Sequence, residues 1–570
     1  MKDRALREKK EYLNIREMIE DVGELYKGKV AYRYRNNPHD KEPIKVTYDE
    51  MRDHVRAFAT EIIARGLKGK KIAVIGKHTY PLIQSYYAVM ATGSVWVPFD
   101  RDWSKEDLYE TVKTGECEFL MCDVDIKEKG EFITSELGLP APLYLTGDGE
   151  DSLLAWREAG REKFLADSTS YYNAEIDPNA LAELVFTSGT TGQGKGVMLS
   201  QKNFMSDLAD VIPFIDFSVK CMNVLPPHHT YGSSVSIYGQ NCIGCDIYIS
   251  SGVKYILKEL QEHKPGHLVA VPLYVETFYR RILKGIADKG KFVAGLIKVI
   301  MSINRTCHKI GLKPLDGFFK KQILANFGGE LNMIISGGAP LNQEMADLFD
   351  AIGVKVLNGY GITECAPILA VNHNHYVVPK SVGPVLPIVD VRIADPNEDG
   401  EGEIQVKGTN VMLGYYKNDE ANAEAFTEDG YFCTGDYGKL EVKADGTRIL
   451  YITGRLKNLI ILSNGKNVYP EEIEDALSAT PGVVDIVVYE GKSRRGDAFN
   501  TIVAEIYPDK GLLEEKGVTD FKAHFQKFVN EYNKTAVPYK KIGLLKVREE
   551  EFPKNTLRKI LRRKMDMTID

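Results

Sequence analysis

The stretch AELVFTSGTTGQGKGVMLS, from Ala182 to Ser200, places glycines and hydroxyls between two apolar segments. From Gly189 to Gly196 it reads G-x-x-x-x-G-K-G, whereas a P-loop has Ser or Thr after the lysine and runs directly into a helix. Here VMLS is strand-like, and a helix is expected only after Ser200, a good N-cap. The glycines still let backbone N–H groups approach an anion, and the hydroxyls add donors. The loop therefore predicts phosphate binding by a device other than a P-loop.

Around this loop, the first half of the chain alternates between helical and extended patterns. DEMRDHVRAFATEIIARGL (49–67) places apolar residues on one helical face, and KKIAVIG (70–76) is a short apolar strand. PLIQSYYAVMATG (81–93) is typical of a helix closed by glycine, and VWVPFD (95–100) is the next strand. Apolar strands separated by helices predict an α/β fold with αβα layers and mostly parallel sheets.

The pattern changes in the second half of the chain. From about 385 to 453, short strands separated by Gly-, Asp- and Asn-bearing turns predict an antiparallel, β-barrel-like subdomain. A compact α+β unit with a basic tail helix follows. We therefore expect a large N-terminal domain, residues 1–456, and a small, mobile C-terminal domain, residues 457–570.

Composition and charge narrow the class of protein. Of the 570 residues, 44% are hydrophobic and 27% charged, and the formal net charge is −7, so nothing requires a nucleic-acid partner. A charged start without an apolar h-region and eight scattered cysteines favour a cytoplasmic location with unpaired thiols, and no apolar run is long enough to span a membrane. Cys242 and Cys245 form a lone C-x-x-C, which we interpret as two core residues.

The loop TSGTTGQGKG (187–196) fits the pattern [ST]-S-G-[ST]-T-G-x-x-K-G. It thereby resembles the phosphate loop of the adenylate-forming superfamily, which includes acyl-CoA synthetases, firefly luciferase and the adenylation domains of peptide synthetases. The resemblance continues in family order through nearly the whole chain. Most members have proline where this chain has Gly194. The resemblance implies that the phosphates of ATP are bound by Thr187, Ser188, Gly189, Thr190, Thr191, Gly192 and Lys195.

Two further segments resemble the parts of the family that hold adenine and ribose. YFCTGD (431–436) matches a motif whose aspartate grips the ribose hydroxyls, which implies that role for Asp436 and places Arg455 nearby. SGGAPL (336–341) is similar to the segment that contacts adenine, here Gly337, Gly338 and Ala339.

The segment NGYGITE (358–364) closely matches the family motif Y-G-x-T-E. The match implies that Tyr360 stacks on adenine, that Thr363 bonds the α-phosphate and that Glu364 helps to hold Mg²⁺. The same nucleotide-binding segment includes Asn358, Gly359 and Gly361.

The resemblance extends across the expected domain boundary. Lys457 falls on the family's hinge position. SNGKNVYPEEIE (463–474) resembles the loop that presents a backbone strand to pantetheine, with Gly465 and Lys466 at its tip. These matches imply coenzyme A as a second cofactor and a C-terminal domain that turns between two positions.

The tail FPKNTLRKILRR (552–563) matches the family's catalytic-lysine motif incompletely. Lys559 falls on the lysine itself, but Asn555 replaces the usual Thr and Arg558 the usual Gly. The basic stretch 554–564 has two open interpretations, a solvated helix face or a contact with CoA phosphates.

The segment LPPHHTYG (225–232) resembles the one whose histidine lines the family's acyl pocket, which maps to His229. We expect the acyl pocket among this histidine, Tyr231, Gly232, Ser233 and the glycines at 337–338. None of these offers a cationic partner for a second carboxylate, which favours an apolar monocarboxylate. A metal site at the adjacent pair His228–His229 lacks further ligands at suitable spacing.

The general run of the sequence is similar to bacterial long-chain fatty-acid–CoA ligases. The insertion-like stretch 284–327 mixes apolar and basic residues. It is interpreted either as a helix packed on its own domain or as a peripheral membrane contact.

The resemblance implies an AMP-forming ligase that joins a medium- or long-chain fatty acid to CoA and uses ATP and Mg²⁺. It gives catalytic roles to Lys559, Thr363, Glu364 and His229. Two alternatives stay open: an acyl-AMP ligase that loads an acyl carrier protein, and a nucleotide-binding regulator without activity. The partners expected are small molecules, and the chain is expected to be a monomer or homodimer.

Overall fold

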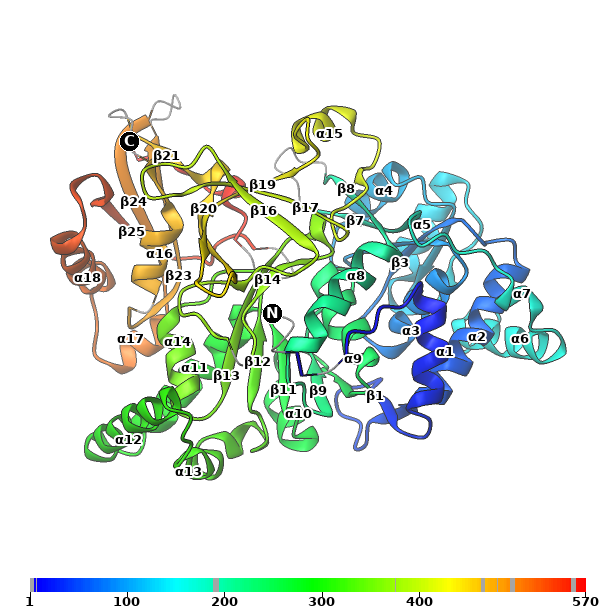
Figure 1. Ribbon diagram of the computed structural model, residues 1–570, viewed down its shortest axis with the longest axis horizontal. Coiled ribbons are helices and arrows are strands. Elements are labelled where there is room, and N and C mark those ends of the chain that lie inside the picture. The colour runs from blue at the N-terminus through cyan, green and yellow to red at the C-terminus, as the bar shows by residue number, and fades with distance from the viewer. Residues whose placement is uncertain are drawn as a thin grey trace.

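Three sheets and the helices around them form a large N-terminal part, and a smaller α+β unit follows it (Figure 1). The computed structural model describes residues 5–6, 8–187, 194–374, 376–462, 467–478, 480–492, 498–554 and 560–569. The mixed α/β architecture with αβα layers confirms the predicted fold class.

The predicted phosphate loop joins two strands of a seven-stranded sheet with the order β18–β8–β7–β4–β3–β5–β6. Five strands, β7, β4, β3, β5 and β6, are parallel to one another. At one edge, β8 pairs antiparallel with β7, and β18 pairs antiparallel with β8. The loop therefore leads from β7 into the neighbouring strand β8, and α8 starts only afterwards, as the sequence predicts; Ser200 caps α8 in a capping box. The strands are β3 (Lys71–Ile75), β4 (Val95–Phe99), β5 (Phe119–Cys122), β6 (Leu143–Tyr144), β7 (Leu181–Phe186), β8 (Gly196–Ser200) and β18 (Gly414–Tyr415).

The second large sheet has eight strands in the order β14–β13–β12–β11–β9–β10–β1–β2. Its strands run parallel except for β14 and β2 at the two edges. The carboxyl ends of β12 and β13 carry the SGGAPL and NGYGITE motifs, so parallel pairing brings these motifs together. The strands are β1 (Val30–Tyr34), β2 (Ile44–Thr47), β9 (Lys220–Asn223), β10 (Asp246–Ile249), β11 (His267–Ala270), β12 (Met333–Ser336), β13 (Lys355–Gly361) and β14 (Ile368–Val371).

One hydrophobic core joins both large sheets. Helices α3 and α8 contribute to it along nearly their whole circumference, as expected for helices packed between two sheets. The helices of the N-terminal part are α1 (Ile15–Leu25), α2 (Tyr48–Ala64), α3 (Tyr80–Ala91), α4 (Lys105–Thr114), α5 (Lys127–Leu137), α6 (Leu153–Ala166), α7 (Thr169–Tyr172), α8 (Gln201–Val211), α9 (Gly239–Cys242), α10 (Ile256–His263), α11 (Pro272–Ala287), α12 (Lys291–Lys309), α13 (Asp316–Gln322), α14 (Gln343–Ala351) and α15 (Asp419–Ala425).

The β-rich segment forms a five-stranded, wholly antiparallel sheet, β15–β20–β19–β17–β16. The predicted antiparallel texture is therefore present, and in the described pairing the sheet keeps two edges, β15 and β16. Its strands are β15 (Gly383–Pro384), β16 (Val389–Ala394), β17 (Gly402–Gly408), β19 (Phe432–Val442) and β20 (Arg448–Arg455).

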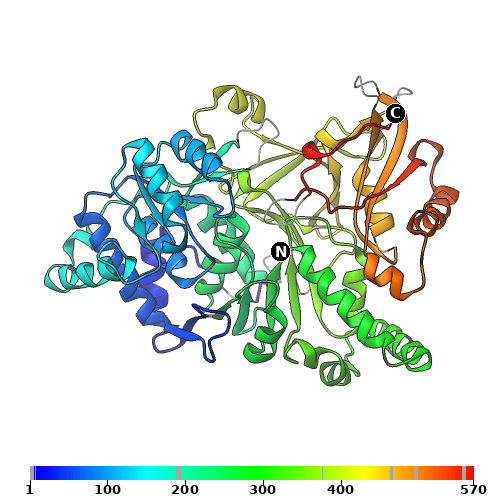
Figure 2. The same cartoon turned by 180° about the vertical axis from the view of Figure 1, so that it is seen from behind.

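The smaller C-terminal unit has its own core, which begins at Ile460, and lies beside the five-stranded sheet (Figure 2). We keep the boundary between residues 456 and 457 as our assignment, since the larger core ends at Leu450. The unit contains β21 (Ile460–Ile461), β22 (Asn467–Val468), β23 (Val483–Lys492), β24 (Ala498–Pro508), β25 (Ile542–Val547), α16 (Pro470–Ser478), α17 (Lys510–Glu515) and α18 (Phe521–Thr535).

The predicted basic tail helix is not found in the part of the tail that the structure describes. Residues 560–569 contain only a 3₁₀ turn, Arg562–Lys564, before the chain runs alongside β23. Arg562 donates to the carbonyl oxygen of Val488. The backbone of Lys492 donates its N–H to the carbonyl oxygen of Met567 and accepts from the N–H of Ile569, which favours an extended course. Among the described residues, no helix is both long and apolar enough to cross a membrane.

Candidate active site

Tyr360, Asp436 and Arg455 meet at the end of β13. The antiparallel register of β19 and β20 sets Asp436 directly opposite Arg455, and the arginine Nε lies 2.9 Å from the carboxylate. Tyr360 donates its hydroxyl to the same carboxylate over 2.6 Å. Burial and the adjacent carboxylate raise the pKa of Tyr360 well above its usual value, so the hydroxyl remains a donor. Three motifs that are far apart in the sequence thus converge, with the carboxylate almost fully buried at 2% exposure.

The backbone around Tyr360 approaches its neighbours closely. A Cβ on Gly361 would lie 2.0 Å from the carbonyl oxygen of Pro367, so only glycine fits there. Gly337 and Gly338 follow β12 beside this turn, and Ala339 is exposed.

Glu364 lies in the short turn Thr363–Cys365 that follows β13. Tyr415 donates its hydroxyl to the Glu364 carboxylate over 2.9 Å, and the Lys195 ammonium lies 4.7 Å from the centre of the Tyr415 ring. A carboxylate beside a triphosphate site suits Mg²⁺, which uses one or two carboxylates together with phosphate oxygens. The donor set therefore fits this ion.

The two ends of the phosphate loop are joined to each other. Thr187 donates its backbone N–H to the carbonyl oxygen of Lys195 over 3.0 Å. A Cβ on Gly194 would lie 2.3 Å from the carbonyl oxygen of Thr187, so glycine at this position allows the ends to cross closely. The remaining loop residues that we predict to bind phosphate, Ser188, Gly189, Thr190, Thr191 and Gly192, lie outside the described residues.

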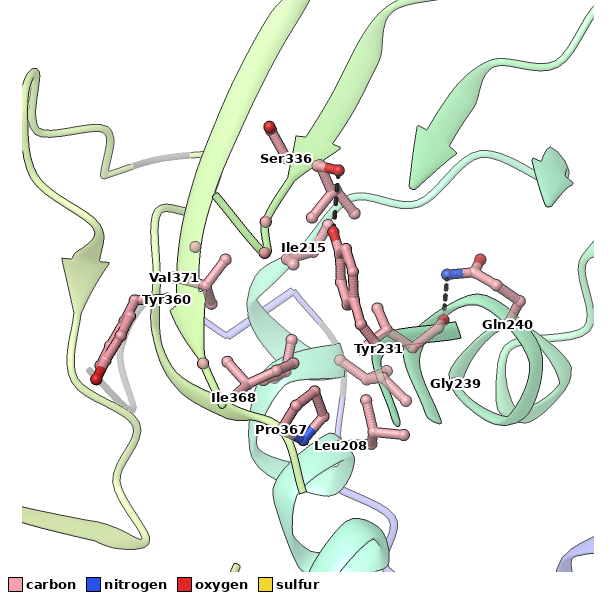
Figure 3. Close-up of a pocket in the computed structure, with 18 of the residues that line it drawn as sticks. Leu208, Ile215, Tyr231, Gly239, Gln240, Ser336, Tyr360, Pro367, Ile368 and Val371 are labelled. Carbon is pink, nitrogen blue, oxygen red and sulfur yellow. Dashed lines mark hydrogen bonds between the residues drawn. The ribbon is translucent and has the colours of Figure 1, made fainter. Parts of the chain in front are cut away.

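An apolar cavity of about 70 Å³ adjoins Tyr360 (Figure 3). Tyr231, Leu208, Pro367 and Ile368 surround it, whereas the ring of Tyr360 lies on the side away from Tyr231. Most of its wall comes from α8 and the segment after it, from the π-helix Tyr231–Tyr238, and from the ends of β12, β13 and β14. The apolar wall is typical of a site for a hydrophobic ligand.

A second, open cleft of about 1780 Å³ lies between the N-terminal part and the C-terminal tail. Thr187 and Gly194 line it on one side, and the tail residues Lys554, Leu561 and Lys564 line it on the other. The tail residues bracket the stretch that contains Asn555, Arg558 and Lys559, which is outside the described residues. The described residues nearest Lys559 therefore face the phosphate loop.

The histidine pair lies between the cavity and the cleft. The rings of His228 and His229 are 4.4 Å apart, and His228 lines the cleft. Burial lowers the pKa of His228 to about 3 and that of His229 well below its usual value, so both are neutral. Tyr231 and the glycines at 337–338 line the cavity as predicted, but His229, Gly232 and Ser233 are not in its lining.

Two residues of the C-terminal region, Lys457 and Lys554, bear on its predicted roles. Gly465 and Lys466 lie outside the described residues, whereas Lys457 is exposed in the turn Leu456–Asn458. Lys554 pairs with Asp485 and Glu551, each over 2.7 Å. This lysine therefore already has structural partners, which disfavours the CoA-phosphate interpretation at that position.

Some site residues could not be found from motifs. Tyr415 lies 51 positions after its partner Glu364, and the pairing of β18 with β8 brings it there. The cavity wall from α8 shows only an apolar helical pattern, which predicts burial but not a void. Asn358 and Gly359, which the motif did predict, lie within β13 next to the wall.

Comparison with known proteins extends the resemblance. Residues 19–416 match the family model described as AMP-binding enzyme. The chain is 28% identical to a chloroplastic long-chain-fatty-acid–[acyl-carrier-protein] ligase of Arabidopsis thaliana, over 86% of this chain and 76% of that protein. It is 29% identical to a long-chain-fatty-acid–CoA ligase of Mycobacterium tuberculosis, over 82% of this chain and 78% of that protein. ATP-bound MatB from Rhodopseudomonas palustris has a similar structure, with a TM-score of 0.74, 25% identity, and coverage of 96% of this chain and 97% of that chain.

Proposed function

Because the chain belongs to the family of AMP-binding enzymes, we propose that it is an AMP-forming acyl-CoA ligase for a medium- or long-chain fatty acid. The relatives named as ligases of long-chain fatty acids support this substrate class. The observation that carries the proposal is the shared wall of the two binding regions. Tyr360, Gly361, Gly337 and Gly338 line the apolar cavity and also belong to the predicted nucleotide motifs. An acid bound in the cavity would present its carboxylate beside the nucleotide.

In the first half of the proposed reaction, the carboxylate attacks the α-phosphorus of ATP and pyrophosphate leaves. Both reactants are anions, so the site must mainly neutralise charge. Asp436, held between Tyr360 and Arg455, would fix the ribose and so align the α-phosphorus. Lys195, Thr187, Thr363 and Lys559 would supply donors to the phosphates.

Mg²⁺, when bound, would neutralise phosphate charge, and Glu364 would be its protein ligand. Tyr415 holds one oxygen of that carboxylate, which orients the group toward the loop. The stacking of adenine on Tyr360 and the roles of the other motif residues follow from the family resemblance and belong to the same proposal.

In the second half, the thiol of CoA attacks the acyl carbonyl carbon and AMP leaves. The tail that carries Lys559 lines the cleft in this structure, so a thiol needs the C-terminal unit to move. A turn about Lys457, which is exposed between the two cores, would bring Gly465 and Lys466 to the channel.

A panel of acids of increasing chain length tests the proposal, with AMP measured with and without CoA. We expect AMP formation to depend on a fatty acid and acyl-CoA to appear only with CoA. Acid-dependent pyrophosphate release without a CoA thioester, but with loading of an acyl carrier protein, would favour the carrier-protein ligase. Absence of acid-dependent AMP with every acid would contradict both.

The Lys559→Ala variant separates the two halves. It should lose most acid-dependent pyrophosphate exchange yet still convert a supplied acyl adenylate and CoA into thioester. Equal loss in both assays would contradict the proposed division of labour between the two positions of the C-terminal unit.

A further inference from the structure

Helix α12 carries an apolar stripe on the side that faces solvent. Phe292, Leu296, Val299 and Ile303 are spaced i, i+4, i+7 and i+11, so they lie on one line along the helix. Their exposed fractions lie between 52% and 86%. Figures 1 and 2 both show α12 at the outer margin of the molecule. The stripe is therefore an unpartnered apolar surface and not part of the core.

The opposite side of α12 is firmly packed. Ile297 and Met301 are buried in the main core, and Asn304 donates to Asp316 over 2.9 Å and to the carbonyl oxygen of Ala351 over 3.2 Å. The interpretation of this stretch as a helix packed on its own domain thus describes one side only. Because that side holds the helix in place, the stripe has a fixed orientation toward solvent.

The apolar surface continues beyond the helix. Ile310 and Leu312 in the following turn are more than half exposed, and Phe318 in α13 is 45% exposed. Single exposed apolar side chains are ordinary on protein surfaces, but a contiguous group is typical of an interaction site.

The charge of this segment is opposite to that of the whole chain. Residues 284–327 contain nine Lys and Arg against two Asp, a net charge of +7, whereas the chain carries −7. Lys291 and Lys298 are exposed and run beside the stripe. Among the described residues, neither ammonium group has a carboxylate within ion-pair distance. Their charge is thus available to an anionic partner.

We propose that the apolar stripe and the lysines beside it dock the protein on a membrane surface with anionic headgroups. An apolar face flanked by basic side chains matches the boundary between acyl chains and anionic headgroups. A second copy fits less well, because a two-fold contact through this surface would bring two segments of +7 together. The stripe lies outside the proposed active site, so this inference is independent of the proposed ligase activity.

Co-sedimentation of the full chain with lipid vesicles tests the proposal. Binding to vesicles of phosphatidylglycerol mixed with phosphatidylcholine is compared with binding to vesicles of phosphatidylcholine alone. We expect binding to the anionic vesicles that weakens with salt. The double variant Phe292→Ser/Leu296→Ser should bind about 10-fold more weakly or worse, because the apolar contact is lost. Lys291→Glu/Lys298→Glu should remove the preference for anionic lipid. Leu165→Ser, at a 75% exposed leucine on α6, is the matched control and should bind like the original chain.

Absence of binding to anionic vesicles, or equal binding by the stripe variants and the control, would overturn the proposal. The proposal would also be overturned if light scattering showed that the stripe variants change only the self-association of the protein, or if the stripe bound only an acidic protein. All three variants change exposed side chains and should keep their thermal stability and their turnover of dissolved substrates. If the stripe variants fail to fold, the charge-reversal pair still decides the question.

Discussion

The apolar cavity and the open cleft adjoin different predicted nucleotide motifs and have different linings: the cavity touches Tyr360 and the glycines at 337–338, and the cleft touches Thr187 and Gly194. The cavity is walled by apolar side chains from α8, the π-helix and strand ends of the eight-stranded sheet. The cleft is lined by loops and by polar and charged residues from both parts of the chain, including Thr187, His228 and Lys554. An apolar wall recognises a ligand by shape and burial, whereas a wide cleft with charged side chains admits charged ligands and allows movement. Under the proposed function, the acid would bind in the cavity, and the phosphates and the thiol would bind in the cleft.

The largest effect should come from Asp436, the buried carboxylate that Tyr360 and Arg455 contact. Asp436→Ala removes the carboxylate that Tyr360 and Arg455 hold in place. Acid-dependent pyrophosphate exchange should fall about 100-fold or more, because the α-phosphorus is no longer aligned. Asp429→Ala in the turn before β19, whose carboxylate pairs with Arg392 at the surface, is the control. A loss no larger than that of the control would remove Asp436 from the site.

A substitution in the cavity wall should change the choice of acid and spare the cleft. A Cβ on Gly239 would make an ordinary 3.4 Å contact with Leu208, so Gly239→Leu fits the backbone but fills the cavity. The kcat/KM for the longest acids should fall about 10-fold, while that for short acids is retained. Gly285→Leu in α11, where nothing lies within 4 Å, is the control. Equal losses for all chain lengths would show that the acid binds elsewhere.

Removal of the Tyr415 hydroxyl tests the proposed Mg²⁺ ligand Glu364. Tyr415→Phe leaves the ring beneath Lys195 but removes the hydrogen bond to Glu364. Loss of such a partner of a metal ligand lowers metal affinity or activity by about 10-fold or more. We expect a lower rate and a higher Mg²⁺ concentration at half-maximal activity. Tyr416→Phe, whose hydroxyl contacts Lys71 and Glu116, is the adjacent control. An unchanged Mg²⁺ dependence would separate Glu364 from the metal.

The smallest effect concerns the thermal stability of the protein and comes from a buried carboxyl group on β7. Glu183 on β7 meets the Ser233 hydroxyl at 3.4 Å, and burial raises the pKa of its carboxyl from 4.5 to about 8. The folded protein therefore keeps a proton that the unfolded chain releases, and this contribution to stability is lost as pH rises from about 4.5 to 8. Glu183→Gln should match the original Tm near the lower end of this window and exceed it by several degrees near the upper end. Parallel Tm curves would contradict the assignment.

The two regions also differ in how much of them the sequence could predict. The loop, Tyr360, Glu364 and Asp436 are recognisable because their chemistry needs fixed residue types at fixed spacing. The α/β order and the antiparallel β-rich segment follow from hydrophobic periodicity. The cavity wall is different, because many combinations of apolar residues can enclose a similar void. Tyr415 was missed because only strand pairing brings it to Glu364. The tail was expected to be helical, but its described part is held alongside β23.

The central claim is that a carboxylate oxygen of the acid attacks the α-phosphorus of ATP. A fatty acid labelled with ¹⁸O in its carboxylate tests this directly, with the phosphate products analysed by mass after turnover with ATP and CoA. The account predicts one labelled oxygen in AMP and none in pyrophosphate. Label in inorganic phosphate, accompanied by ADP, would contradict it, because the attack would then have occurred at the far end of the triphosphate.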